Sequence, residues 1–201
     1  MVCVAPNLRA LGHQSSDTTA FSLVKTSDGV SLYERWYSTA GGDRARELRA
    51  RFFVKADPMA AVALIRDERR GTGWNTGTKI YRVVSSDSAA WLCHIEYNLP
   101  WPLSDQECVL LFNERFEDRC VEVAFRGVDH PAFTARRNVQ RIEDISGKWI
   151  FIRTQNGIAV EYFITTKPSS TLPAWVTDPI IRSNLISTLT SFRAILEAGS
   201  H

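Results

Sequence analysis

The sequence lacks the features of several large functional classes. In its 201 residues no apolar run approaches the ~20 residues that a membrane-spanning helix needs. The 24 Lys and Arg are offset by 22 Asp and Glu, and they are scattered along the chain. A net charge of +2 without a basic block gives no indication of a nucleic-acid partner. We therefore expect a soluble protein that does not bind nucleic acid.

Motifs for catalysis are also missing. The chain has no G-x-S-x-G elbow, no phosphate-binding glycine loop, no dinucleotide-binding fingerprint and no H-E-x-x-H. Only four histidines are present, and two of them lie near the chain ends, which leaves little imidazole for acid–base work. We therefore expect no catalytic residues and no cofactor.

The four cysteines, Cys3, Cys93, Cys108 and Cys120, do not form a metal-binding pattern, because no C-x-x-C and no paired histidine spacing accompanies them. Cys93 and Cys108 fall on consecutive expected strands and could approach each other. Free cysteine is commonly buried as a small apolar residue, and this interpretation is favoured for both.

The composition is that of one globular domain, with 44% hydrophobic and 23% charged residues. We assign residues 18–198 to the domain and residues 1–17 to an N-terminal extension. The extension lacks the basic start and apolar stretch of a secretory signal, which leaves a cytoplasmic protein, or a periplasmic or secreted one whose signal has been removed. The final Gly199-Ser200-His201 resembles the start of an expression tag.

Short strand-like segments with turn signals between them dominate the chain. Asp28-Gly29 joins two of them as a hairpin, Gly41-Gly42-Asp43 marks a second turn, and Asn156-Gly157 is the strongest turn signal. Connections this short predict an antiparallel meander. The expected strands are 21–26, 30–37, 47–55, 79–85, 89–98, 107–116, 120–127, 138–145, 148–153 and 158–166, with a further turn at Ser146-Gly147.

Two helices are expected. Asp57 can cap a short helix that has Pro58 at its first position and runs to about Arg66, and residues 67–78 form a loop or a short broken helix. Asp178 and Pro179 are the expected start of a long final helix, which residues 174–177 extend by one turn. Its apolar stripe is Ile181, Leu185, Leu189, Phe192 and Leu196.

These elements predict an α+β fold in which the final helix packs across the concave face of a curved antiparallel sheet. Strand alternation gives the inward side chains, which either line an apolar cavity or fill a solid core. The predicted ligand-binding residues are Trp74, Ile95, Tyr97, Leu110, Phe112, Val123, Phe125, Val160, Tyr162, Leu185, Leu189 and Phe192.

Some polar side chains have two interpretations. His94 and Glu96 could form an inward pair, but alternation favours the outer face. Tyr33, Tyr81, Tyr97 and Tyr162 each offer a hydroxyl to a buried ligand. Trp74 either lines a gate or anchors its loop.

Several short stretches carry a family resemblance through their order and spacing. They are Trp74-Asn75, Asn98-Leu-Pro-Trp-Pro-Leu-Ser-Asp-Gln-Glu107, Val139-Gln-Arg141, Gly147-Lys-Trp149, Gly157-Ile-Ala-Val-Glu-Tyr162 and Lys167-Pro-Ser-Ser-Thr-Leu-Pro-Ala-Trp175. Together they resemble the START (StAR-related) lipid-transfer domain of the helix-grip superfamily, and the Pro-Trp-Pro-Leu stretch resembles bacterial members. The resemblance extends from about Phe21 to Leu196.

The sequence departs from this family at three points. Asn75 stands where the family usually has Asp, Gln106-Glu107 where it usually has Arg-Asp, and residues 167–170 where it usually has Asp-Pro-Gly-Gly. The loss of the usual Arg and Asp is expected to remove charged partners. Arg141 aligns with an Arg that the family often has, and we expect it to form a structural ion pair.

The resemblance implies a cavity between the sheet and the last helix that admits one hydrophobic molecule: a lipid, fatty acid, phospholipid or sterol. It also implies transfer of this ligand, with transient membrane contact. Two alternatives remain: a polyketide aromatase or cyclase on the same fold, and a ligand-sensing regulatory domain.

Overall fold

The computed structural model describes residues 20–39, 41–85, 89–101, 103–134, 136–137, 139–166 and 174–199. The extension predicted for residues 1–17 lies outside them. The elements in chain order are β1 (Ser22–Ser27), β2 (Val30–Ser38), β3 (Arg44–Val54), α1 (Pro58–Arg66), α2 (Glu68–Trp74), β4 (Thr78–Ser85), β5 (Ala90–Tyr97), β6 (Gln106–Glu117), β7 (Cys120–Gly127), β8 (Gln140–Arg141), β9 (Ile145–Thr154), β10 (Gly157–Thr166) and α3 (Ala174–Ala198).

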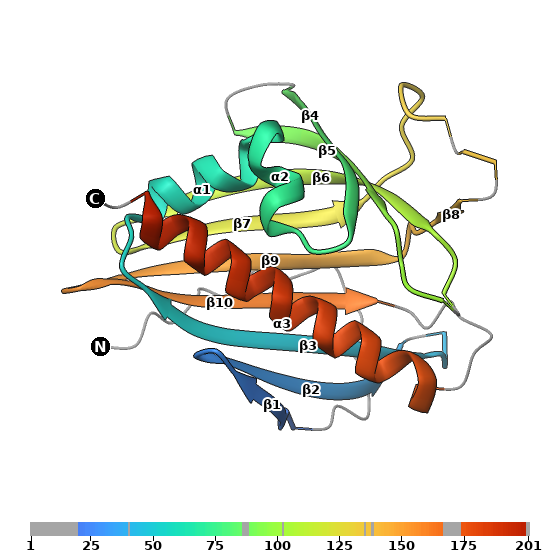
Figure 1. Ribbon diagram of the computed structural model, residues 1–201, viewed down its shortest axis with the longest axis horizontal. Coiled ribbons are helices and arrows are strands. Elements are labelled where there is room, and N and C mark those ends of the chain that lie inside the picture. Colours follow the sequence, from blue (N-terminus) through green and yellow to red (C-terminus); the bar gives the residue numbers. More distant parts are fainter. Residues whose placement is uncertain are drawn as a thin grey trace.

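One curved sheet contains all the described strands, in the order β1-β2-β3-β10-β9-β7-β6-β5-β4. These strands pair in antiparallel fashion, whereas the two-residue β8 pairs in parallel with β6. Figure 1 shows α3 lying diagonally across one face of the sheet, with α1 and α2 on the same side. The predicted α+β architecture, a curved antiparallel sheet around a long C-terminal helix, is confirmed.

Local turn chemistry explains the hairpins. Asp28 and Gly29 have φ angles of 50° and 75°, the positive values that a two-residue turn between β1 and β2 requires. A second tight turn joins β9 to β10 just before Gly157, whose φ of 145° suits only glycine. The turn predicted at Asp28-Gly29 is confirmed, and the one predicted at Asn156-Gly157 lies one residue earlier, at Gln155-Asn156.

The short helices also follow from their caps. The Asp57 carboxylate accepts a hydrogen bond from the Met59 N–H at 2.8 Å, and Pro58 occupies the first turn of α1, as predicted. The Asp67 carboxylate accepts from the Arg69 N–H at 2.9 Å and so begins α2. The stretch expected to be a loop or a broken helix therefore starts with a seven-residue helix, which ends at Trp74.

Three predicted boundaries were wrong. Ser146-Gly147 is not a turn, because both residues pair within β9; a Cβ on Gly147 would collide with the Phe163 carbonyl oxygen, so close strand packing explains this glycine. The strand expected over residues 138–145 is reduced to β8. Asp178 does not cap α3, because the helix already begins at Ala174 and continues through Pro179.

The two faces of the sheet differ in what covers them. Apolar residues on the concave face form one large core with α1, α2 and α3. On the convex face a smaller cluster of Leu92, Val109 and Phe133 lies over β5 and β6. The interior beneath α3 is therefore the main hydrophobic region of the described residues.

Candidate functional site

The twelve predicted ligand-binding residues meet in the concave core. Ten of them are buried, and Tyr97 and Leu185 are partly buried against the same cluster. The cluster draws them from α2, β5, β6, β7, β10 and α3. The strand alternation inferred from the sequence is thus confirmed, and contact of these residues with a ligand stays a prediction.

Aromatic rings fill the space beneath the second half of α3. The ring of Phe192 lies 5.1 Å from that of Trp74 and 4.7 Å from that of Trp149, and Tyr162 lies 4.4 Å from Trp149. Trp74 is 4% exposed, so it is a core anchor and not an exposed gate residue. Trp149 was not among the predicted site residues, although the Gly147-Lys-Trp149 stretch contained it.

Packing is looser beneath the first half of α3. Leu189 and Phe192 are fully buried, whereas Leu185 and Ile181, one and two turns before Leu189, keep accessible surface. Ile164 on β10 and Tyr97 at the end of β5 are likewise only partly buried. Two apolar side chains on the first half of α3, those of Ile181 and Leu185, thus keep accessible surface, as does that of Ile195 near its end.

A polar pair lies at the edge of this region. The Asn75 amide donates to the Tyr97 hydroxyl at 3.2 Å, and burial raises the pKa of Tyr97 well above its usual value. The Thr76 N–H donates to the Thr188 hydroxyl at 3.0 Å, which ties the segment after α2 to α3. Tyr97 therefore stays a neutral phenol that can both donate and accept.

The other tyrosines are placed differently. The Tyr81 hydroxyl donates to the Ile65 carbonyl at 2.7 Å and is committed to the backbone. Tyr33 lies on the convex face, where the Arg49 guanidinium carbon is 4.8 Å from the centre of the Tyr33 ring. Tyr162 is buried among aromatic rings, and burial raises its pKa above its usual value. Tyr81, Tyr97 and Tyr162 face the interior, although the Tyr81 hydroxyl is already engaged, and the prediction is wrong for Tyr33.

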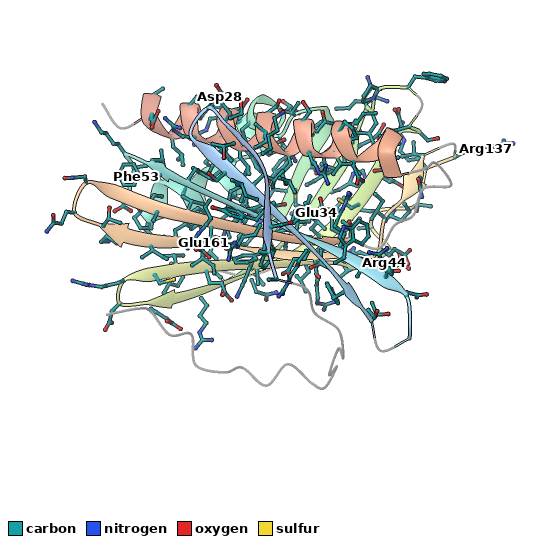
Figure 2. The ribbon with its side chains drawn as sticks, turned by 90° about the horizontal axis from the view of Figure 1, so that it is seen from below. Asp28, Glu34, Arg44, Phe53, Arg137 and Glu161 are labelled. Atoms are coloured by element: carbon teal, nitrogen blue, oxygen red, sulfur yellow. The ribbon has the colours of Figure 1, made fainter. Side chains whose placement is uncertain are left out.

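Ion pairs fasten the first turns of α3 to β2 and β3. Arg46, 6% exposed, pairs with Asp178, and Arg182 Nη2 lies 2.8 Å from Glu34 Oε2. The Trp36 indole N–H also donates to Glu34 at 2.7 Å. We call Glu34, Arg46, Asp178 and Arg182 the α3 ion-pair cluster; Figure 2 shows Glu34 between the sheet and the helix. Sequence analysis missed this cluster, although Glu34 shares its face of β2 with the buried Leu32.

A second polar cluster lies on the convex face. His94 Nε2 is 2.9 Å from Glu107 Oε2, and the Arg141 guanidinium and the Arg136 N–H donate to Glu107 Oε1 at 3.2 and 3.0 Å. Lys79 Nζ lies 2.9 Å from Glu96 Oε1. The predictions of an outer-face His94 and Glu96 and of a paired Arg141 are confirmed.

Both carboxylates of this cluster are buried, and one expectation for it needs correction. Glu96 and Glu107 are fully buried, because the segment carrying Phe133 and Arg136 covers this part of the sheet. Glu107 also replaces the usual Asp without loss of pairing, since its carboxylate holds both Arg141 and His94. The departure from the family pattern therefore does not remove the charged partner.

Two of the described cysteines are core residues. Cys93 and Cys108 are buried and free, and burial raises the pKa of Cys108 to about 12. Thiols with such pKa values stay protonated and behave as small apolar groups. This confirms their interpretation as core residues.

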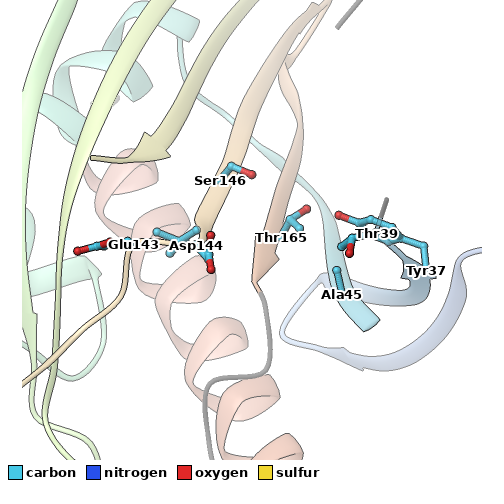
Figure 3. Close-up of a pocket in the computed structure, with 8 residues that line it drawn as sticks. Tyr37, Thr39, Ala45, Glu143, Asp144, Ser146 and Thr165 are labelled. Carbon is cyan, nitrogen blue, oxygen red and sulfur yellow. The ribbon is translucent and has the colours of Figure 1, made fainter. Parts of the chain in front are cut away.

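Two surface pockets open away from the concave core. One of about 250 Å³ is lined by Tyr37, Thr39, Ala45, Glu143, Asp144, Ile145, Ser146 and Thr165. Ala45 alternates with Arg46, which faces α3, so this pocket lies on the convex side, as Figure 3 shows. The other, of about 350 Å³, lies between the Asp28-Gly29 turn and the outer side of α3. Neither is the predicted interior cavity.

The described ranges contain no group of three His, Cys, Asp or Glu side chains placed to hold a metal ion. Within these ranges no helix is both long and apolar enough to cross a membrane.

Comparison with solved structures identifies the architecture. The structure matches a STAR-related lipid transfer protein fragment of Xanthomonas axonopodis with a TM-score of 0.76 and 22% identity, over 88% of this chain and 98% of that one. The chain has the START-domain fold. Human StAR-related lipid transfer protein 5 matches with a TM-score of 0.74 and 15% identity, over 92% and 90% of the two chains.

The START fold is also used by proteins with other activities. The ZhuI aromatase/cyclase of a Streptomyces species matches with a TM-score of 0.55 and 10% identity, over 76% of this chain and 94% of that one. An uncharacterized Pseudomonas aeruginosa protein is 22% identical over 179 residues, which are 88% of this chain and 87% of that protein. No family model matches the sequence.

Proposed function

We propose that this START-fold protein binds a hydrophobic small molecule of the lipid class between its sheet and α3, and transfers it. The observation that carries the proposal is the concave core, in which nearly all inward side chains of the described strands are apolar. Its architecture matches that of proteins described as lipid transfer domains, with TM-scores of 0.76 and 0.74.

The ligand would lie beneath the first half of α3. Aromatic rings pack around Phe192 beneath the second half of α3. Beneath the first half, Leu185, Ile181 and Ile164 keep accessible apolar surface that a ligand could cover. Tyr97 is strongly desolvated and yet partly accessible, as expected for a side chain that borders an enclosed space. The proposed site is therefore bounded by Tyr97, Ile164, Ile181 and Leu185.

Binding would be noncovalent. Apolar burial contributes roughly 25 cal/mol per Å², which favours a ligand with a long or polycyclic apolar body. The Tyr97 hydroxyl and the Asn75 amide would orient the ligand's polar end, since they are hydrogen-bonding groups at the border of the site. Entry requires α3 to lift at its first turns, where the α3 ion-pair cluster, rather than aromatic packing, holds it.

The described imidazoles do not supply an acid–base group for cyclase chemistry beneath α3. An aromatase would need an acid–base group over its substrate. Among the described residues, His94 lies on the convex face with Glu107, and His130 packs beside Phe133. Neither imidazole faces α3.

Filling the proposed space tests its position. We expect Leu185→Trp to reduce uptake of a fluorescent fatty acid or sterol at least about ten-fold, because the larger ring occupies the volume that the ligand needs. Ser183→Trp is the matched control, since Ser183 is exposed on the same helix. Circular dichroism establishes that both variants are folded. Equal uptake by the two folded variants would place the ligand elsewhere.

A further inference from the structure

Five aromatic rings form an unbroken row across the concave core. The ring centres of Phe125 and Tyr162 lie 6.0 Å apart, and those of Tyr162 and Trp149 lie 4.4 Å apart. The row continues from Trp149 to Phe192 at 4.7 Å and from Phe192 to Trp74 at 5.1 Å. Each step is at the separation of packed aromatic rings. We call these five residues the aromatic wall.

The aromatic wall joins the sheet to the helices that cover it. Its members come from β7, β9, β10, α2 and α3, and each is at most 8% exposed. Figure 1 shows α3 crossing β9 and β10 on this face of the sheet. The wall therefore fills the height between sheet and helices and closes the interior at this level.

A glycine allows the row to cross β9 close to the sheet. A Cβ on Gly147 would lie 2.5 Å from Phe125 Cζ, so the Phe125 ring passes directly over this residue toward Tyr162. A larger residue at position 147 would push the ring away. The wall thus has no opening where it passes over β9.

Accessible apolar surface begins directly beyond the wall. On α3, Leu189 is fully buried, whereas Leu185 and Ile181 keep accessible surface. On β10, Tyr162 belongs to the wall, and Ile164, two residues further along the strand, keeps accessible surface. The proposed ligand site therefore has the aromatic wall as its inner end.

The length of this site follows from regular geometry. The eight residues from Ile181 to Leu189 correspond to about 12 Å along α3. The four residues from Tyr162 to Thr166, where β10 ends, correspond to about 14 Å. An extended chain advances roughly 1.2 Å per bond, so about ten carbons fill this length, whereas sixteen carbons need about 18 Å.

We propose that the aromatic wall sets the length of the ligand, so that the protein selects single-chain lipids of about ten carbons over longer chains. With its polar end at Tyr97, such a chain would run beneath the first half of α3 and end against Phe192 and Trp149. A longer chain would have to displace closely packed rings or leave its end in water. A two-chain lipid would need the same space twice. This inference rests on the proposed function, because it names the ligand class of the same site.

The test is titration calorimetry of the delipidated wild-type protein with saturated fatty acids of eight to eighteen carbons. Each methylene group that leaves water strengthens binding roughly four-fold. We expect the affinity to rise at this rate up to about ten carbons and then to stop rising or to fall. A rise that continues through sixteen carbons overturns the proposal, and this measurement needs no variant.

Two variants test whether the wall sets the limit. Phe192→Leu and Trp149→Phe each remove part of a ring and should extend the longest chain that still gains affinity by about two carbons. Phe53→Leu is the matched control, because Phe53 is 42% exposed on the convex face and should keep the wild-type limit. A limit that stays unchanged in the folded wall variants, or that moves equally in the control, overturns the role of the wall.

The results separate this inference from the proposed function. Binding that strengthens through eighteen carbons refutes only the length limit, and so does binding of a sterol or phospholipid without binding of any fatty acid. A protein that binds none of these molecules refutes the proposed function itself.

Discussion

Replacement of Phe192 by alanine is expected to lower the free energy of unfolding by about 3–5 kcal/mol. Phe192 is fully buried, and its ring packs against Trp74 at 5.1 Å and Trp149 at 4.7 Å. Alanine would remove a ring that joins α3 to α2 and β9 and would leave a void among rigid aromatic neighbours. Aspartate at the same position would place a carboxylate in this cluster and should prevent folding.

Urea unfolding followed by circular dichroism measures the change. Phe116→Ala is the control, because Phe116 is 55% exposed and its loss should change the free energy of unfolding by no more than about 0.5 kcal/mol. A cost below about 1 kcal/mol for Phe192→Ala would contradict the packed aromatic centre and would imply that the region beneath the second half of α3 is also open.

Substitution of Glu107 by glutamine is expected to cost about 3–5 kcal/mol, although Glu107 lies on the face away from α3. Its fully buried carboxylate holds His94, Arg141 and the Arg136 N–H. Glutamine keeps the shape but removes the charge that balances the buried Arg141 guanidinium. Arg141 also donates to the Phe133 carbonyl, so the covering segment should loosen together with the ion pair.

The matched control is Glu122→Gln. Glu122 pairs with Lys148 at 2.9 Å on the half-exposed part of the convex face, where such a pair contributes about 0–1 kcal/mol. Both substitutions remove one carboxylate charge from a strand. The difference between their costs in free energy of unfolding therefore isolates the effect of burial. Similar costs for both would show that the Glu107 cluster is solvated.

The Glu107 cluster also predicts a pH dependence. Burial raises the pKa of Glu107, but hydrogen bonds from His94, the Arg136 N–H and Arg141 outweigh it and hold the pKa below its usual value. In the unfolded chain the pKa returns to about 4.3. This contribution to stability is therefore complete above about pH 5 and is lost as the pH falls through the folded-state pKa. The gap between wild type and Glu107→Gln should shrink over this acidic range, and a gap that is constant with pH would contradict the assignment.

Much of the fold was predictable because local signals agree with the tertiary structure. Asp28-Gly29 specifies its turn by positive φ, and alternation on β7 separates Val121, Val123 and Phe125 from Glu122 without ambiguity. The stripe on α3 from Ile181 to Leu196 packs on the core as its spacing predicts. These features depend on neighbours in sequence, which a single chain displays directly.

The predictions that were wrong concern residues whose roles depend on contacts between segments far apart in the sequence. Gly147 was taken for a turn residue because its need for space arises from Phe163, on the neighbouring strand. Asp178 was taken for a helix cap, but its carboxylate pairs with Arg46, 132 positions away in sequence. Neither contact has a signature at the residue itself.

The candidate site was predictable only in part for the same reason. Alternation identified the inward apolar residues, but it could not show that Trp74, Trp149 and Phe192 meet and close the space beneath one half of α3. The burial of Glu107 depends on the chain segment that covers it. Each of these properties is set by the assembled fold.

Native mass spectrometry with lipid extraction, on protein purified from a lipid-rich host, tests the central claim most directly. We predict one hydrophobic molecule bound per chain, released on unfolding and reduced in occupancy by Leu185→Trp. Such a ligand would establish the proposed site and identify the chemical class for transfer assays. A protein that is empty on isolation and takes up no sterol, fatty acid or phospholipid would contradict the proposal of a lipid-binding site beneath α3.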